Sequence, residues 1–75
     1  MRKINEIAKE ILRIWKKPYF GAVPYLEAML KLETIDDYYG FDDAKSIINY
    51  FLANATYWRG EDARRIKKEL KEIIN

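Results

Sequence analysis

The sequence contains no cysteine and no histidine among its 75 residues. Without cysteine, the chain has no disulfide framework, no thiolate nucleophile and no cysteine-based zinc or iron–sulfur site. Without histidine, it lacks the most frequent general base at neutral pH and the most frequent imidazole metal ligand. These absences remove the commonest kinds of catalytic and metal centre. We therefore predict a protein that is not an enzyme and has no cofactor.

Long apolar runs are missing too. No stretch approaches the roughly 18 apolar residues of a transmembrane helix, and the segment after Met1-Arg2-Lys3 alternates charge with isoleucine, unlike a signal peptide. Glycine and proline are few (three and two), and the chain has no repeat or linker. We expect one soluble, cytoplasmic domain over residues 1–75, without membrane contact.

Aromatic residues are abundant by contrast. The chain has two tryptophans, six tyrosines and three phenylalanines, and 49% of its residues are hydrophobic. A domain of this size buries only about 60–65% of the surface that its unfolded chain exposes. Each large ring can bury on the order of 150–250 Å². We therefore predict that aromatic rings compensate for the missing disulfides and metal sites.

Apolar residues recur at helical spacing in four segments. Pro18 ends the first segment because the residue before a proline is pushed out of the α region. Pro24 suits the first turn of the second helix, where its missing N–H costs nothing. We predict helices over about residues 3–17, 22–33, 43–57 and 61–74.

The segment between the second and third helices carries capping signals. Residues 34–37, Thr-Ile-Asp-Asp, resemble a capping box. Gly40 lies where a left-handed helix cap would fall, and Asp42 or Asp43 can cap the following helix. We predict a short helical turn near 35–39. The expected fold class is all-α, a compact bundle of four main helices plus this turn.

Four aspartates flank Gly40, and carboxylates are ligands for hard cations such as calcium. They are Asp36, Asp37, Asp42 and Asp43. The EF-hand pattern fails, because its first and twelfth positions would be Ile35 and Ser46. Helix capping explains Asp37 and Asp42 without a metal. We predict neither a metal site nor an acid–base pair here.

Charge is divided unevenly along the chain. Residues 1–20 carry a net charge of +4, residues 21–55 carry −4 and residues 56–75 carry +2. These charges suit solvated helix faces, but a positive face formed by the terminal helices is also an electrostatic footprint for nucleic acid. The last helix would offer phosphate contacts but almost no side chains that read base edges. Its cationic residues are Arg64, Arg65, Lys67, Lys68 and Lys71.

Six tyrosines are too many for a small core to hide completely. They either shield the core with wet hydroxyl groups or form an interface, since interface centres are rich in aromatic residues and arginine. Tyr38 and Tyr39 are the best interface candidates, because adjacent side chains on one helical turn cannot both point inward. Trp58 with Arg59 forms either a binding hot spot or, more commonly at a helix end, part of the core.

Several stretches together resemble a family of short uncharacterised helical proteins of bacteriophages and actinobacterial genomes. They are the run from Tyr19 to Met29, Asp37, Tyr39-Gly40, the run from Tyr50 to Ala55, Trp58-Arg59-Gly60 and Ala63. The resemblance covers roughly residues 4–71, and it carries no known activity. Helix surfaces rich in isoleucine and lysine depart from the family's alanine and arginine. A redesigned member and a homologue from a low-GC host both fit this departure.

These observations predict a non-enzymatic protein–protein interaction module. The resemblance implies a phage or prophage accessory protein. A nucleic-acid-binding protein that uses the basic terminal helices is the alternative. The partner is unknown, and a homodimer is compatible with so small a core.

Overall fold

The structure is a computed structural model that describes residues 2–75, with extents of 29 × 25 × 19 Å. It contains four α-helices, one 3₁₀ turn and one short antiparallel hairpin. In chain order the elements are α1 (Ile4–Ile14), η1 (Phe20–Ala22), α2 (Val23–Met29), β1 (Tyr38–Tyr39), β2 (Asp42–Asp43), α3 (Ala44–Ala53) and α4 (Glu61–Ile74). The molecule is therefore mostly helical, as the sequence predicts, with one exception between α2 and α3.

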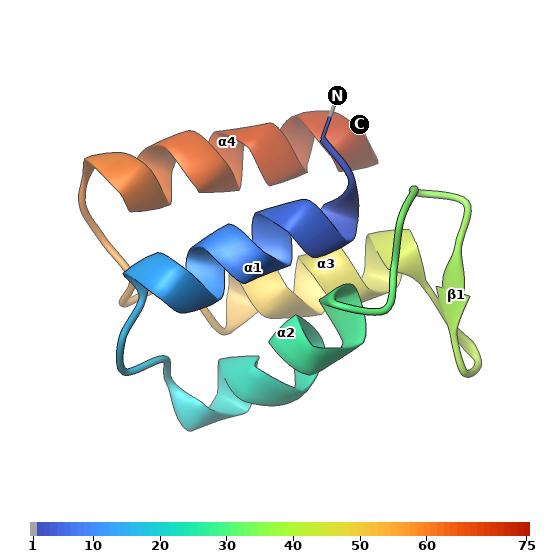
Figure 1. Cartoon of the computed structure of the whole chain (residues 1–75), viewed down its shortest axis with the longest axis horizontal. Helices are drawn as coiled ribbons and strands as arrows, with labels where there is room; N and C mark the ends of the chain where they lie inside the picture. Colours follow the sequence, from blue (N-terminus) through green and yellow to red (C-terminus); the bar gives the residue numbers. More distant parts are fainter. Residues whose placement is uncertain (1) are drawn as a thin grey trace.

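Consecutive helices run in opposite directions (Figure 1). Helix α1 packs against α2 and α4, and α3 packs against the same two helices. This alternation places the α1–α2 and α3–α4 connections at one end of the molecule. The hairpin lies at the other end (Figure 1), where both ends of the described chain also lie. The two ends carry different side chains, which is the basis of the functional argument below.

The core consists of apolar side chains from all four helices and from the α3–α4 connection. Each of them is at most 6% exposed: Ile4, Ile7, Ala8, Ile11, Ala22, Leu26, Ala28, Met29, Leu32, Ala44, Ile47, Ile48, Phe51, Ala55, Trp58, Ala63, Ile66 and Leu70. Among residues 2–75, no polar or charged residue is fully buried. Burial of these side chains is the main favourable contribution to folding.

Helix α1 is shorter than predicted. The sequence predicts a helix over about residues 3–17, but α1 ends at Ile14. The ring of Pro18 would clash with the carbonyl of Ile14 in a continued helix, and Pro18 has no N–H to donate to it. The proline therefore ends the helix four residues before its own position, so that Trp15 is free to turn toward the core.

Helices α2 and α3 are also shorter than the predicted spans of 22–33 and 43–57. Helix α2 ends at Met29, after which the backbone tightens to bonds three residues apart, such as the 3.1 Å bond from the N–H of Leu32 to the carbonyl of Met29. Helix α3 ends at Ala53, and the Asn54 side chain donates to the carbonyl of Tyr50 at 2.8 Å beside the 3.2 Å backbone bond from its own N–H. The bounds of α4 agree with the predicted span of 61–74.

The prediction of a short helical turn near 35–39, and with it a strictly all-α fold, is wrong. Tyr38 and Tyr39 form strand β1 and pair with β2 in an antiparallel hairpin. The loop between the strands has two residues, and its first, Gly40, adopts a φ of +65°. A glycine with positive φ at that position is what a type II′ hairpin turn requires. Gly40 therefore turns the chain back on itself and does not cap a helix.

Candidate binding surfaces

The hairpin exposes three aromatic rings at the tip of the molecule. Tyr38 is 68% exposed, Tyr39 is 47% exposed and Phe41 is fully exposed. The strand pairing explains this, because Tyr38 lies opposite Asp43 and Tyr39 opposite Asp42 in a ribbon only two residues long. Exposed rings on adjacent residues have almost no neighbours to cover them, and contiguous exposed apolar surface marks an interaction site more often than an isolated apolar residue does.

The same segment is strongly acidic. Residues 33–43 contain five carboxylates and no basic residue. Two of the carboxylates, Asp37 and Asp43, accept hydrogen bonds from backbone N–H groups. Asp36 and Asp42 are exposed, and their carboxylates accept no such bond. We call Asp36, Tyr38, Tyr39, Phe41 and Asp42 the acidic aromatic hairpin.

Asp37 and Asp43 both accept hydrogen bonds from backbone N–H groups, but only Asp43 caps a helix. Asp37 Oδ2 accepts from the N–H groups of Glu33 and Thr34 at 2.8 and 3.0 Å, and these bonds lower the pKa of its carboxyl. Asp43 Oδ1 accepts from the N–H of Ser46 at 2.8 Å, which caps α3 and lowers the pKa of Asp43. Within residues 2–75, no group of three or more His, Cys, Asp or Glu side chains is arranged to hold a metal ion.

A cavity of about 190 Å³ opens at the same end of the molecule as the hairpin. Its walls come from residues 2–4, residues 33–35 and Ile73. Two backbone hydrogen bonds join the start of α1 to the segment after α2. The N–H of Ile4 donates to the carbonyl of Glu33, and the N–H of Asn5 donates to the carbonyl of Leu32. The cavity is mostly apolar, with an ion pair between Lys3 and Glu33 at its rim.

Trp58 and Arg59 are separated in role although they are adjacent in sequence. Trp58 is only 6% exposed, and its ring stacks on Trp15 with centroids 5.3 Å apart and planes within 9°. This is the core role that a tryptophan at a helix end often has, and it leaves Trp58 little surface for a partner. Arg59 is exposed beside it. The α1–α2 and α3–α4 connections are held together by this stacked pair.

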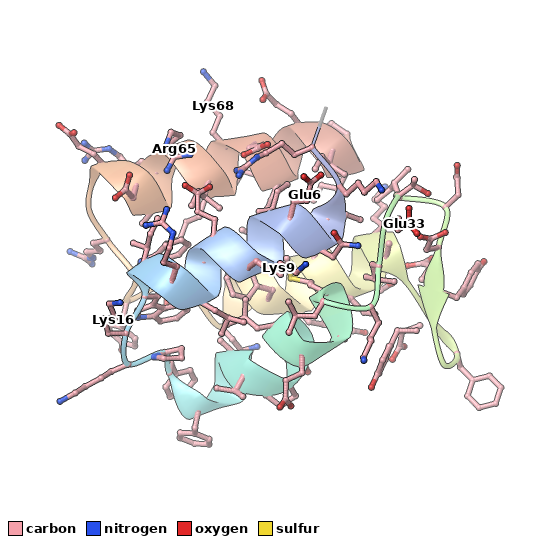
Figure 2. All side chains as sticks on the ribbon, in the orientation of Figure 1. Glu6, Lys9, Lys16, Glu33, Arg65 and Lys68 are labelled. Carbon is pink, nitrogen blue, oxygen red and sulfur yellow. The ribbon has the colours of Figure 1, made fainter. Side chains whose placement is uncertain are left out.

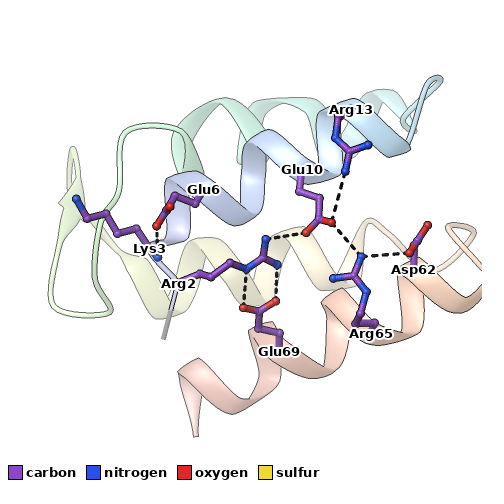
Figure 3. Close-up of polar contacts among 8 residues, drawn as sticks. All are labelled: Arg2, Lys3, Glu6, Glu10, Arg13, Asp62, Arg65 and Glu69. Atoms are coloured by element: carbon purple, nitrogen blue, oxygen red, sulfur yellow. Dashed lines mark hydrogen bonds and ion pairs between the residues drawn. The ribbon is translucent and has the colours of Figure 1, made fainter.

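The predicted positive face of the terminal helices is partly neutralised. Arg2 forms a bidentate ion pair with Glu69 and a second ion pair with Glu10 (Figure 3). The guanidinium of Arg65 lies 3.0 Å from the carboxylate of Glu10 and 3.1 Å from that of Asp62. We call these five residues the α1–α4 ion cluster. The arginines lower the pKa of Glu10 and Glu69, and the carboxylates raise the pKa of Arg2 and Arg65. The cluster joins α1 to α4.

The predicted nucleic-acid contacts on α4 fall into two groups. Arg65 belongs to the ion cluster, and Lys67 donates to the carbonyl of Trp58 at 2.6 Å, with burial, Lys71 and Arg59 lowering its pKa. The other three, Arg64, Lys68 and Lys71, are exposed at positions i, i+4 and i+7 of the helix. Figure 2 shows Lys68 projecting away from the bundle. Three of the five predicted cations therefore share an open stripe.

The sequence does not predict a site at three of the most exposed rings, Phe20, Phe41 and Tyr57. A glycine at the first position of a two-residue loop is typical of a hairpin turn, so Gly40-Phe41 carries a signal for the exposure of Phe41. Phe20 lies in a segment that the sequence predicts only as a turn, and it is 79% exposed. Phe51, by contrast, is buried in the core, as its helical spacing predicts.

A comparison of this chain with models of protein families, with curated proteins and with solved structures finds no match. The resemblance to short phage and actinobacterial proteins therefore stays a prediction. Within residues 2–75, none of the helices combines the length and apolar character that crossing a bilayer needs.

Proposed function

We propose that this protein is a non-enzymatic interaction module that binds a cationic segment of a partner protein through the acidic aromatic hairpin. The observation that carries the proposal is the exposure of three aromatic rings within four residues, two on strand β1 and one in the turn that follows it. Most of these ring surfaces do not contribute to the core. The rings lie among carboxylates, because residues 33–43 contain five acidic residues and no basic residue.

The chemistry of the hairpin specifies the partner. An arginine guanidinium stacks on the face of a tyrosine or phenylalanine, and the same group can make a two-pronged contact with an exposed carboxylate such as Asp36 or Asp42. Along the chain the three rings are flanked by aspartates on both sides, so a segment that carries both basic and apolar residues satisfies both groups. The cavity beside the hairpin adds room for one apolar side chain of the partner.

The pKa values of the carboxylates support the proposal that the protein is not an enzyme. Four of them have perturbed pKa values, namely Glu10, Asp37, Asp43 and Glu69, and each pKa is lowered. A general acid at neutral pH needs a raised pKa instead. Each of these groups has a structural partner, either a backbone N–H at a cap or an arginine of the ion cluster.

The test uses an array of dodecapeptides that alternate arginine with leucine, together with counterparts in which glutamate replaces arginine. The tightest binder is then titrated by fluorescence anisotropy against the wild type and against Tyr38→Ala, Tyr39→Ala and Phe41→Ala. We expect each change to weaken binding about tenfold, because interface rings of this kind contribute roughly 1–2 kcal/mol each. The melting temperature should stay within a few degrees of wild type.

Phe20→Ala is the matched control, since Phe20 is an exposed ring at the opposite end of the molecule. It should leave peptide affinity unchanged. Equal binding of the glutamate peptides would overturn the proposed partner chemistry. Sedimentation of the wild type as a dimer that Tyr38→Ala dissociates would instead identify a second copy of the chain as the occupant, and would overturn the proposal of a cationic partner protein.

A further inference from the structure

The end of the molecule opposite the hairpin carries a second set of exposed rings, and its charge is of the other sign. It is formed by residues 15–22 and 54–60, which contain three basic residues and no carboxylate. Phe20 is 79% exposed and Tyr57 is 82% exposed. We call Lys16, Lys17, Phe20, Tyr57 and Arg59 the cationic loop surface.

Two contacts bring the loops together. Trp15 stacks on Trp58, which joins the segment leading into Lys16 and Lys17 to the segment that carries Tyr57 and Arg59. Gly21 approaches Asn54 so closely that a Cβ on Gly21 would lie 2.8 Å from Asn54 Oδ1 and 2.6 Å from the ring of Tyr19. This second contact brings the backbone next to Phe20 close to the end of α3. Figure 1 shows both connections at the same end, and Figure 2 shows Lys16 pointing outward there.

These cations are not used inside the fold. Arg2 and Arg65 have carboxylate partners in the α1–α4 ion cluster, whereas no ion pair within residues 2–75 includes Lys16, Lys17 or Arg59. The nearest acids along the chain are Glu61 and Asp62, at the start of α4. Asp62 is paired with Arg65. The loop surface therefore keeps a net positive charge around two exposed rings, with Glu61 as a single carboxylate at its edge.

We propose that the cationic loop surface binds single-stranded nucleic acid. Proteins that bind single strands combine cations that follow the phosphates with aromatic faces on which bases stack. The loop surface has both. Its rings lie on loops and not on a helix that could enter a groove of duplex DNA. An end of this molecule, at most 25 × 19 Å, accommodates about four nucleotides, near the lower limit of known single-strand sites.

A duplex is a poorer ligand for this surface. Bases in a duplex are stacked on one another and are not free to stack on Phe20 or Tyr57. An anionic membrane is poorer as well, because membrane-surface binding relies on a continuous apolar helix face. Here only Phe20 is a fully apolar exposed ring in the two loops, and Tyr57 carries a hydroxyl group.

The test is a fluorescence anisotropy titration of a labelled thymidine octanucleotide at 20 mM NaCl. We expect binding to the wild type, at least tenfold weaker binding of an eight-base-pair duplex, and a log–log salt slope of about −2 for three phosphate contacts. Phe20→Ala and Tyr57→Ala should each weaken binding about tenfold. Lys17→Ala and Arg59→Ala should weaken it and reduce the slope by about one contact.

Phe41→Ala and Lys68→Ala are the matched controls, an exposed ring on the hairpin and an exposed cation on α4. Both should retain wild-type affinity. Equal losses in Lys68→Ala and Lys17→Ala would move the site to the α4 stripe and overturn the proposal, as would no binding of the octanucleotide. Binding of phosphatidylserine vesicles that Phe20→Ala abolishes, with no effect on the oligonucleotide, would identify a membrane as the ligand.

If a variant does not fold, chemical-shift mapping on the wild-type protein takes the place of the affinity measurement on that variant. Titration with the octanucleotide should then shift the backbone amides of residues 16–20 and 57–59 most strongly. Shifts centred on residues 64–71 would contradict the proposed site.

Discussion

At the scale of single residues, the aromatic side chains divide into structural and surface rings. Phe51 and Trp58 are buried, and Trp15 connects them, edge-on to Phe51 at 6.4 Å and stacked on Trp58. These three rings join α1, α3 and the α3–α4 connection. The most exposed rings, Phe41 and Tyr57, lie at opposite ends of the molecule. Composition predicts that rings stabilise so small a domain, but only the structure shows which of them do so.

Trp58→Ala should therefore destabilise the protein by about 3 kcal/mol, as deletion of a buried aromatic ring does. The loss includes the stacking contact with Trp15 and the space left behind the ring. Urea unfolding followed by circular dichroism measures it. Tyr57→Ala is the control, since the neighbouring ring is 82% exposed, and its cost should be within about 0.5 kcal/mol of zero. Equal costs for the two substitutions would contradict the core role of Trp58.

Gly21→Ala tests the close approach of the two loops. The added Cβ would lie closer to the Tyr19 ring and to Asn54 than ordinary contacts allow. We expect a lower melting temperature and weaker binding of the octanucleotide, because Phe20 moves with Gly21. Thermal melts of Gly21→Ala and the wild type give the comparison. A variant with unchanged stability and affinity would show that the loops do not depend on this contact.

At the scale of elements, the sequence predicts what local signals determine. The bounds of α4 follow from periodicity, and the end of α1 before Pro18 follows from proline geometry. The capping signal allows Asp42 or Asp43, and the structure has Asp43 at the cap. The hairpin was missed because one capping signal fits two structures. Asp37 accepts backbone N–H groups as a capping box predicts, but the chain after it turns at Gly40 rather than continuing as a helix.

The candidate surfaces were predictable in part. Adjacency alone indicates that Tyr38 and Tyr39 cannot both be buried. The sequence favours a core role for Trp58, and the structure confirms its burial. The stacking of Trp58 on Trp15 and the pairing of Arg65 were not predictable, because both depend on which distant residues meet in the fold. Arg65 finds Glu10, which is 55 positions away in the chain.

Gly40→Ala tests the hairpin turn. No atom lies within 4 Å of the position that the new Cβ would take, so any cost comes from the positive φ alone. We expect a loss of about 1 kcal/mol. Gly40→Asn should lose less, since asparagine tolerates this conformation better. Chemical denaturation of the three proteins provides the values. A neutral Gly40→Ala would contradict the turn geometry.

The α1–α4 ion cluster predicts the acid sensitivity of the fold. Its arginines lower the pKa of Glu10 and Glu69 in the folded state. Because the folded pKa lies below the unfolded pKa, the cluster stabilises the protein above the unfolded pKa, and this contribution disappears as the pH falls through the folded pKa. Asp37 and Asp43 add to the same acid sensitivity.

Glu10→Gln should therefore flatten the decline of the melting temperature between about pH 5 and pH 2. The difference from wild type should shrink in 1 M NaCl, since ion pairs of this exposure are screened by salt. Glu27→Gln is the control, because no ion pair within residues 2–75 includes Glu27. An identical pH profile for Glu10→Gln and wild type would show that the cluster does not contribute to stability.

At the scale of the whole molecule, alternating helix directions separate two surfaces of opposite charge. One end presents the acidic aromatic hairpin, and the other presents the cationic loop surface. A net charge of only +2 conceals this separation. The helices in between hold the two ends at opposite sides of the bundle. The central claim is that the exposed rings at the two ends bind different ligands.

The most direct test of this claim is a pair of chemical-shift titrations on the ¹⁵N-labelled wild-type protein. One uses the cationic peptide selected from the array, and the other uses the thymidine octanucleotide. We expect the peptide to shift amides within residues 36–43 and the octanucleotide to shift amides within residues 16–20 and 57–59, with little overlap. Shifts at the same residues for both ligands, or no shifts at either end, would contradict the account.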